Sequence, residues 1–368
     1  MKTAKGLAVL LIAAALAACL FPAIAASPAT GPGPTDAKPD VPVIEVRKRI
    51  LQLLEEGALY RDRIDWPAAR QQLQDANGSA EADSSILDQL ISRSTANHGR
   101  WIRASMMNRA PGSRTSPRGD QLQEQIAAKD ISSQNPERTD ATDPIGWISI
   151  PAFMDHADAA TRVRYQQRQA FARQLQERLR TQDAQDRCGW IVDLRQNRGG
   201  NMWPMLVGIS PLLSTDPRNR EVIGAFDAGT THQIWSIQSG RVLLDERSPV
   251  QLDSPGYVLR HPAPPVAVLL GPKTGSSGEA VALAFRGRPA TRSFGQETAG
   301  YSTANKPTPL PDGSILLLTG SISVDRHLKG DGGKLKPDVP VGSAQDATNA
   351  ARSWLMAQPG CKAMPRRQ

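Results

Sequence analysis

The chain has 368 residues, of which 39% are hydrophobic and 22% charged, and its formal net charge is +8. This length and composition predict one large or two modest domains with a hydrophobic core, and they exclude a disordered chain. A nucleic-acid-binding face needs clustered basic residues with stacking aromatics, but the arginines are spread along the chain and only 5% of residues are aromatic. Binding to nucleic acid is therefore not expected.

The first 25 residues have the pattern of an export signal, because Lys2 and Lys5 precede the apolar run 7–20 and small residues follow. Two cleavages remain open. Ala-Ile-Ala at 23–25 fits a signal peptide of residues 1–25, whereas Leu-Ala-Ala before Cys19 fits a lipoprotein that loses residues 1–18. In either case we expect an exported protein, periplasmic or secreted, whose only membrane tether would be a lipidated Cys19.

Residues 26–43 are rich in Pro, Ala, Gly and Thr, which predicts a flexible linker. Apolar residues then recur at helical spacing and predict a small helical domain over residues 44–107. Asp65 before Trp66-Pro67 indicates the start of one of its helices. Residues 108–143 are polar and lack periodicity, which predicts a loop too short to form an independent domain.

Strand and helix patterns alternate over residues 144–345, and a terminal helix and tail follow over residues 346–368. This alternation predicts a mixed α/β fold. The expected strands are 147–150, 190–194, 233–236, 266–270 and 314–318, and the expected helices are 157–179, one after Asn201, and 347–356.

Cys188 and Cys361 remain as a pair after either cleavage. In an oxidising compartment an even number of cysteines favours a disulfide, which would attach the carboxyl terminus to the core; two unlinked thiols are the alternative. Neither these cysteines nor the five histidines have the spacing of a metal site. No metal and no other cofactor are expected.

The segment Lys-Thr-Gly-Ser-Ser-Gly-Glu at 273–279 joins the apolar strand 266–270 to a helix-favouring sequence. A serine in the first turn of a helix lies where unpaired N–H groups and the helix dipole favour developing negative charge. Ser276 is therefore a candidate nucleophile, and a plain helix cap is the alternative. Glu279 lies three residues further on the same helical face, so it is a candidate to orient a catalytic base; a solvated glutamate is its alternative.

Three blocks in order carry a family resemblance: Ala-Asn-His-Gly-Arg-Trp-Ile at 96–102, Asp-Leu-Arg-Gln-Asn-Arg-Gly-Gly at 193–200, and the serine segment followed by Gly-Gln-Glu-Thr-Ala-Gly at 295–300. Together they resemble the carboxy-terminal processing (tail-specific) serine peptidases. In particular they resemble the branch that contains the nisin-resistance protein, tricorn-like peptidases and interphotoreceptor retinoid-binding protein. The resemblance implies a ClpP/crotonase-like β-β-α peptidase core preceded by a small helical bundle. The shortness of the loop 108–143 implies that the PDZ domain of many members is absent.

The resemblance also implies a serine-type endopeptidase that cleaves a peptide or protein substrate through an acyl-enzyme intermediate, with His98 as the base for Ser276. Better-known tail-specific proteases use a lysine base, but Tyr301 stands at that position here. A Ser-His mechanism is therefore expected rather than a Ser-Lys one. Lys273 and Lys306 lie outside the family position and are expected on the surface.

The backbone N–H of Ser277 and that of Gly199 or Gly200 are the candidate donors of an oxyanion hole, since glycine permits a close backbone approach. A plain turn is the alternative for the Gly-Gly pair. Tricorn-like relatives orient the base with an acidic residue nearer the carboxyl end, where this chain offers Asp331 and Asp338.

Two departures from the family pattern count against catalytic activity and keep a different class of function open. Arg198 replaces the usual third glycine, and Gly99 follows His98 where many relatives have serine. The alternative is a catalytically inactive, peptidase-like protein that binds a peptide or an apolar ligand. For an enzyme with an unperturbed histidine, of pKa about 6.5, the acidic limb of kcat/KM is expected near neutrality.

Overall fold

The computed structural model describes residues 43–76, 80–107, 143–155, 160–216, 218–253 and 256–363. The predicted export signal, Cys19, the linker except Val43 and the polar loop except Asp143 lie outside these residues. The expectation that a PDZ domain is absent concerns that loop, so it stays a prediction. The described residues belong to one compact unit. None of their helices is both long and apolar enough to span a bilayer.

The amino-terminal part is helical, as its periodicity predicts. Its elements are α1 (Val43–Gly57), η1 (Arg61–Arg63), α2 (Trp66–Asp75), α3 (Ala80–Ser94), β1 (Arg100–Ile102) and α4 (Ala104–Met107). Helix α2 begins at the predicted place, because the Asp65 side chain accepts a hydrogen bond of 3.0 Å from Ala68 N. Ile50, Leu54 and Leu87 are fully buried in a small core of this part.

Two sheets build the remainder. The parallel five-stranded sheet has the order β11-β8-β7-β3-β2, and the antiparallel six-stranded sheet has the order β1-β10-β4-β5-β6 with β9 on β10. The strands are β2 (Ile145–Ser149), β3 (Gly189–Asp193), β4 (Glu221–Asp227), β5 (His232–Gln238), β6 (Arg241–Leu244), β7 (Val266–Leu270), β8 (Thr291–Gly295), β9 (Thr303–Pro309), β10 (Ile315–Val324) and β11 (Val339–Pro340). The helices are α6 (Thr161–Asp183), α7 (Met202–Gly208), α8 (Ser210–Leu213), α9 (Ser277–Phe285), α10 (Ala344–Met356) and α11 (Pro359–Lys362). The mixed α/β prediction is confirmed.

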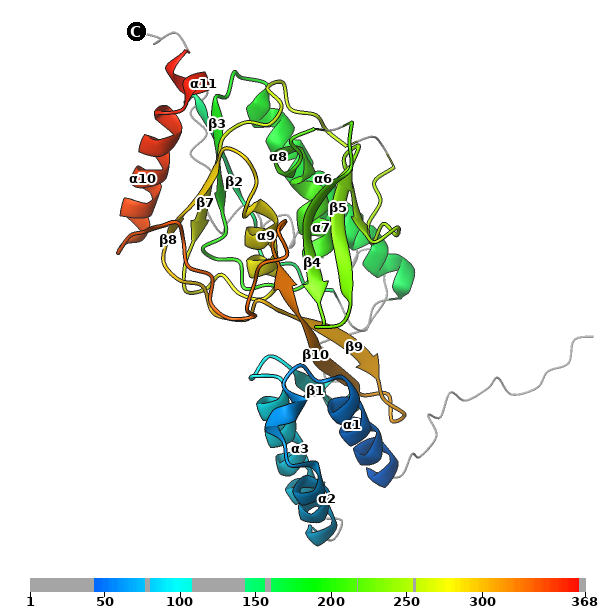
Figure 1. Ribbon diagram of the computed structural model, residues 1–368. Helices are drawn as coiled ribbons and strands as arrows, with labels where there is room; N and C mark the ends of the chain where they lie inside the picture. Colours follow the sequence, from blue (N-terminus) through cyan, green and yellow to red (C-terminus); the bar gives the residue numbers. More distant parts are fainter. Residues whose placement is uncertain are drawn as a thin grey trace, which may run out of the picture. The chain divides into compact units, whose positions relative to one another are not determined.

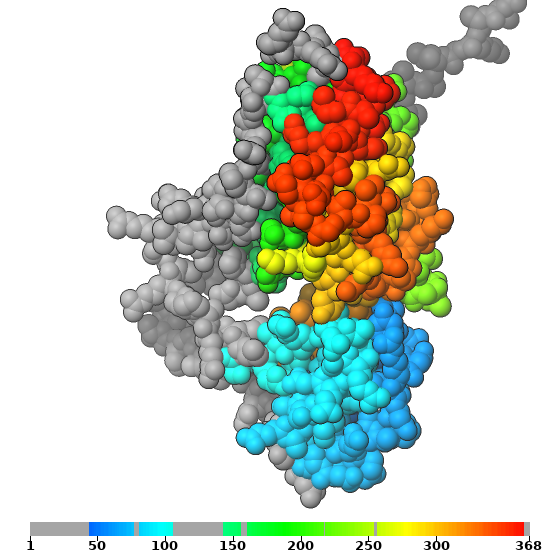
Figure 2. Space-filling view, turned by 90° about the vertical axis from the view of Figure 1, so that its left-hand side faces the viewer, coloured from blue at the N-terminus to red at the C-terminus, as the bar shows by residue number. Residues whose placement is uncertain are grey.

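Helices cover both faces of the parallel sheet, and this explains the unbroken apolar sequence of β7. Val268 and Leu270 pack in the core that includes residues of α6, α7 and α9, whereas Ala267 and Leu269 pack with buried residues of α10. Figure 1 shows α10 and α6 on opposite sides of these strands. In Figure 2, the red region at the surface of the molecule includes α10.

Strand β10 connects the helical part to the α/β core. It pairs with β1 over Ile315–Leu317 and with β4 over Ile322–Val324. Leu316 and Leu318 belong to the same small core as α1 and α3, and Figure 1 shows β9 and β10 running between the two regions. The histidine block, which contains β1, thereby shares one sheet with β4, β5 and β9.

A disulfide joins Cys188 to Cys361 and closes a separation of 173 residues. It attaches α11 to the residue that precedes β3, in the core of the parallel sheet. The carboxyl-terminal helices are thus held to the sheet by a covalent bond as well as by packing.

We expect Cys361→Ser to lower the free energy of unfolding by about 2–4 kcal/mol, because the unfolded chain regains the freedom of a long loop. Urea titration of the oxidised wild type and the variant measures this difference. The double variant Cys188→Ser/Cys361→Ser is the control and should lose little more than the single variant. Equal stability of wild type and Cys361→Ser would contradict the expectation.

Candidate active site

Ser276 is the N-cap residue of α9, in the turn that follows β7. Its φ of 52° lies in the left-handed region, which costs free energy for a residue other than glycine. Hydrogen bonds hold the turn: Ser276 N donates to Glu279 Oε2 at 2.8 Å, and the Ser276 carbonyl accepts from Glu279 N at 2.8 Å and from Ala280 N at 3.0 Å. The hydroxyl therefore projects from a fixed turn at the positive end of a helix.

His98 lies between α3 and β1, and its Nε2 is 3.0 Å from Ser276 Oγ across 178 residues of sequence. Its Nδ1 contacts Thr303 Oγ1, at the start of β9. If the ring proton is on Nδ1, Thr303 can accept it and Nε2 is free to accept the serine proton. The structure brings the expected base and nucleophile into hydrogen-bonding distance.

The backbone around His98 is also held in place. The His98 carbonyl accepts a hydrogen bond of 3.0 Å from Asn305 Nδ2, and His98 N donates to Thr95 O at 3.1 Å. A Cβ on Gly99 would stand 2.8 Å from Thr95 Oγ1 and 2.9 Å from Leu317 O. The departure from the family pattern at Gly99 therefore has a packing reason.

Burial lowers the pKa of His98 to about 4. Only the neutral imidazole can accept a proton from Ser276, and at this pKa the ring is neutral throughout the range from pH 5 upward. The expectation of an acidic limb near neutrality assumed a histidine in water. With the lowered pKa the acidic limb is instead expected at a lower pH, because desolvation disfavours the charged imidazolium.

Glu279 is fully buried, and its two carboxylate oxygens accept four hydrogen bonds. Oε1 accepts from Thr298 Oγ1 and from Gly300 N at 2.9 Å. Oε2 accepts from Ser276 N and Tyr301 N, each at 2.8 Å. Burial raises the pKa of the Glu279 carboxyl, and these donors oppose that effect. The carboxylate joins the serine turn to the segment 298–301.

Among the described residues, Glu279 makes no hydrogen bond to His98, the base that it was predicted to orient. The residue next to His98 Nδ1 is Thr303, whereas the acceptor positions of Glu279 are occupied by other donors. Tyr301, at the position of the family lysine, has its ring centroid 5.2 Å from that of His98. Helical spacing correctly places Glu279 near Ser276, but it does not show which segment the carboxylate meets.

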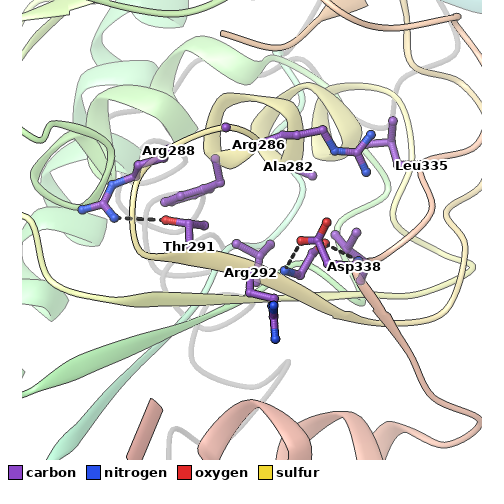
Figure 3. A pocket seen from close by; sticks show the side chains of 12 residues that line it. Ala282, Arg286, Arg288, Thr291, Arg292, Leu335 and Asp338 are labelled. Carbon is purple, nitrogen blue, oxygen red and sulfur yellow. Dashed lines mark hydrogen bonds between the residues drawn. The ribbon is translucent and has the colours of Figure 1, made fainter. Parts of the chain in front are cut away.

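The two alternative acids also lie in other environments. Asp331 Oδ1 accepts a hydrogen bond of 2.9 Å from Gly333 N. Asp338 Oδ2 accepts from Ser293 N and Ser293 Oγ, each at 2.8 Å. Asp338 lines a separate cavity of about 330 Å³ together with Arg286 and with Ala282 of α9, and Figure 3 shows these side chains around it. Both carboxylates are thus engaged in loop contacts, not with the candidate base.

The Gly-Gly pair of the second block lies directly against the nucleophile. Gly199 and Gly200 have φ values of 102° and 112°. A Cβ on Gly199 would stand 2.8 Å from both Gly275 O and Ser276 Cβ, so only glycine permits this approach. Ser277 begins α9, and its N–H therefore has no acceptor one turn earlier within the helix.

The hydrogen bonds distinguish the two glycines. Gly199 N donates to Asn197 Oδ1 at 2.9 Å, so this N–H is engaged within the loop. Ser277 Oγ donates to Gly200 O at 2.6 Å, and Asn197 O accepts from Gly275 N at 3.0 Å. Of the two glycines proposed for an oxyanion hole, Gly200 is the better candidate, together with Ser277 N.

Several residues of this site were not singled out from the sequence. Thr303 and Asn305 follow the third block but carry no local signal, whereas Thr298 is part of the quoted Gly-Gln-Glu-Thr-Ala-Gly motif. Lys273 and Lys306 are exposed, as expected, and Lys273 Nζ donates to Gln196 Oε1 at 3.3 Å.

Comparison with known proteins identifies the relatives of this arrangement. Residues 144–341 match Peptidase family S41. The nisin-resistance protein of Lactococcus lactis subsp. lactis is 34% identical over 171 residues, which cover 46% of this chain and 50% of that protein. The chain thus spans about half the length of this curated relative.

Two solved structures share the fold. A lipoprotein from Streptococcus agalactiae is similar with a TM-score of 0.63 and 23% identity, over 85% of this chain and 95% of that chain. The photosystem II D1 C-terminal processing protease is similar with a TM-score of 0.53 and 12% identity, over 87% of this chain and 99% of that chain.

Proposed function

The chain belongs to peptidase family S41, and from this premise we propose that it is an exported serine endopeptidase of the Ser-His type. The observation that carries the proposal is the 3.0 Å separation of His98 Nε2 and Ser276 Oγ at the start of α9. A serine hydroxyl needs such a base to become an effective nucleophile.

In the proposed reaction, Ser276 Oγ attacks the carbonyl carbon of the substrate while His98 Nε2 takes its proton. The N–H groups of Ser277 and Gly200 would donate to the oxyanion of the tetrahedral intermediate. His98 then gives the proton to the leaving amine, which leaves an acyl group on Ser276. Water, deprotonated by His98, then attacks the acyl carbon, the ester bond to Ser276 Oγ breaks, and His98 returns the proton to Oγ as the second product leaves.

The part of the proposal that concerns export rests on the first 25 residues and on the disulfide Cys188–Cys361, since disulfides persist in oxidising compartments. We propose a periplasmic or secreted protein, with lipidated Cys19 as the alternative form at a membrane. The substrate would be a peptide or a protein.

A fluorophosphonate probe tests the nucleophile, because it reacts with activated serines. We expect wild type to be labelled in the presence of a chelator and Ser276→Ala to be unlabelled. Ser353→Ala, which changes an exposed serine on α10, is the matched control and should be labelled like wild type.

If the wild type is neither labelled nor hydrolytic but binds peptides, this proposal is wrong and the protein is a peptidase-like binding protein. The neutral hydroxyl of Thr303 beside His98 Nδ1, where a carboxylate would stabilise the imidazolium more strongly, is the observation that favours this second candidate. Labelling that persists in Ser276→Ala would show that another serine is the nucleophile.

A further inference from the structure

We propose that Met154 gives the site a preference for an apolar side chain on the substrate residue whose carbonyl is attacked. The inference rests on the proposed function and defines a substrate class for the same site. Met154 is 70% exposed. Single exposed apolar side chains are common on protein surfaces, so its position carries the argument rather than its exposure.

Met154 belongs to another segment and packs against Gly200 of the Gly-Gly loop, and this loop lies beside the nucleophile. A Cβ on Gly200 would stand 2.9 Å from Met154 Sδ, and a Cβ on Gly199 would stand 2.8 Å from Ser276 Cβ. The thioether and the nucleophile therefore flank the same pair of glycines. A carbonyl held by Gly200 N–H brings its own side chain close to the thioether, because the Cβ of that residue is only two bonds from the carbonyl carbon.

The segment on the amino-terminal side of Met154 is fixed to this loop. Phe153 N donates to Gly199 O at 3.2 Å, and Asn201 N donates to Phe153 O at 2.6 Å. The Phe153 ring packs against Phe171 with 4.8 Å between centroids. Met154 is thus presented from backbone that is hydrogen-bonded to the Gly-Gly loop.

The residue that follows Met154 is fixed as well. Asp155 accepts two hydrogen bonds of 2.7 Å from the Arg168 guanidinium and one of 2.8 Å from Asn201 Nδ2. Because the residues before and after Met154 are both held by hydrogen bonds, little backbone freedom is lost when Met154 binds a substrate. The flexible, polarisable methionine can then fit apolar partners of several shapes. We therefore expect residues such as Leu, Met or Phe before the cleaved bond.

Peptidyl diphenyl phosphonates that differ only in the residue next to phosphorus, Leu or Ala, test the preference through their rate of reaction with Ser276. We expect wild type to react at least about tenfold faster with the Leu probe, a difference typical of a small apolar subsite. Met154→Ala should lower the Leu rate about 5- to 50-fold and leave the Ala rate within about twofold. Met154→Leu should stay close to wild type, and Met356→Ala, an exposed methionine on α10, is the matched control.

Binding of the corresponding fluorescent peptides to the Ser276→Ala protein separates this inference from the proposed function, because binding needs no nucleophile. A Leu-over-Ala preference in affinity that disappears in Ser276→Ala/Met154→Ala supports the subsite even if the phosphonates do not react. The inference is overturned if Met154→Ala leaves the ratio of the Leu to the Ala value unchanged, in reaction rate or in affinity. An equal loss for both probes, or a wild type without a Leu preference in both measurements, overturns it too.

Discussion

His98→Ala is expected to lower kcat/KM for peptide hydrolysis by about three or more orders of magnitude. Nε2 of His98 lies 3.0 Å from Ser276 Oγ, and without this acceptor the hydroxyl keeps its proton and remains a poor nucleophile. Progress curves for wild type and variant, compared at equal concentrations of folded protein, measure the loss. His261→Ala removes an exposed histidine and should leave the rate unchanged.

The pH profile gives a second measurement of the same base. Since burial lowers the pKa of His98 to about 4, the imidazole is neutral above that pH and kcat/KM should fall only as the pH drops through about 4. The residual activity of His98→Ala should lack this limb. A wild-type limb near 6.5 would show that His98 is more hydrated than its contacts indicate. Activity that survives His98→Ala but not Lys273→Ala or Lys306→Ala would make lysine the base.

Glu279→Ala is expected to destabilise the fold by about 3 kcal/mol or more, because it leaves four donors around a fully buried position without their acceptor. The donors are Ser276 N, Thr298 Oγ1, Gly300 N and Tyr301 N. Activity should be lost with stability, since the same carboxylate holds the strained serine turn. Urea titration and fluorophosphonate labelling measure the two effects.

Glu279→Gln distinguishes the two roles of this residue. A glutamine offers one acceptor oxygen where the carboxylate offers two. If Glu279 holds the serine turn to segment 298–301, this variant should therefore lose stability as well. A role in orienting His98 predicts unchanged stability and a reduced kcat. Glu297→Ala, at an exposed glutamate in the neighbouring segment, is the control and should behave like wild type. Full stability with reduced kcat in Glu279→Gln would restore the orienting role.

Local patterns were sufficient where neighbouring residues decide the conformation. The apolar run Val266–Leu270 is β7 with the predicted bounds, and Asp65 is the N-cap of α2. Helix α6 begins at Thr161, four residues after the expected start, and its N-cap residue Ala160 makes no side-chain capping bond that could have indicated the boundary. Strand β9 was not expected at all. It contains Pro307 and Pro309, and its pairing with β10, rather than strand propensity, makes it a strand.

The sequence by itself determined the strand-turn-helix around Ser276 and, through the order of its three blocks, the family. Only the tertiary structure decided which side chains surround the serine. His98 and Thr303 meet because β1 and β9 both pair with β10. Glu279 contacts residues 298–301 because that segment returns beside α9. Capping and periodicity depend on residues a few positions apart, whereas the contact of His98 with Ser276 spans 178 positions and depends on sheet pairing.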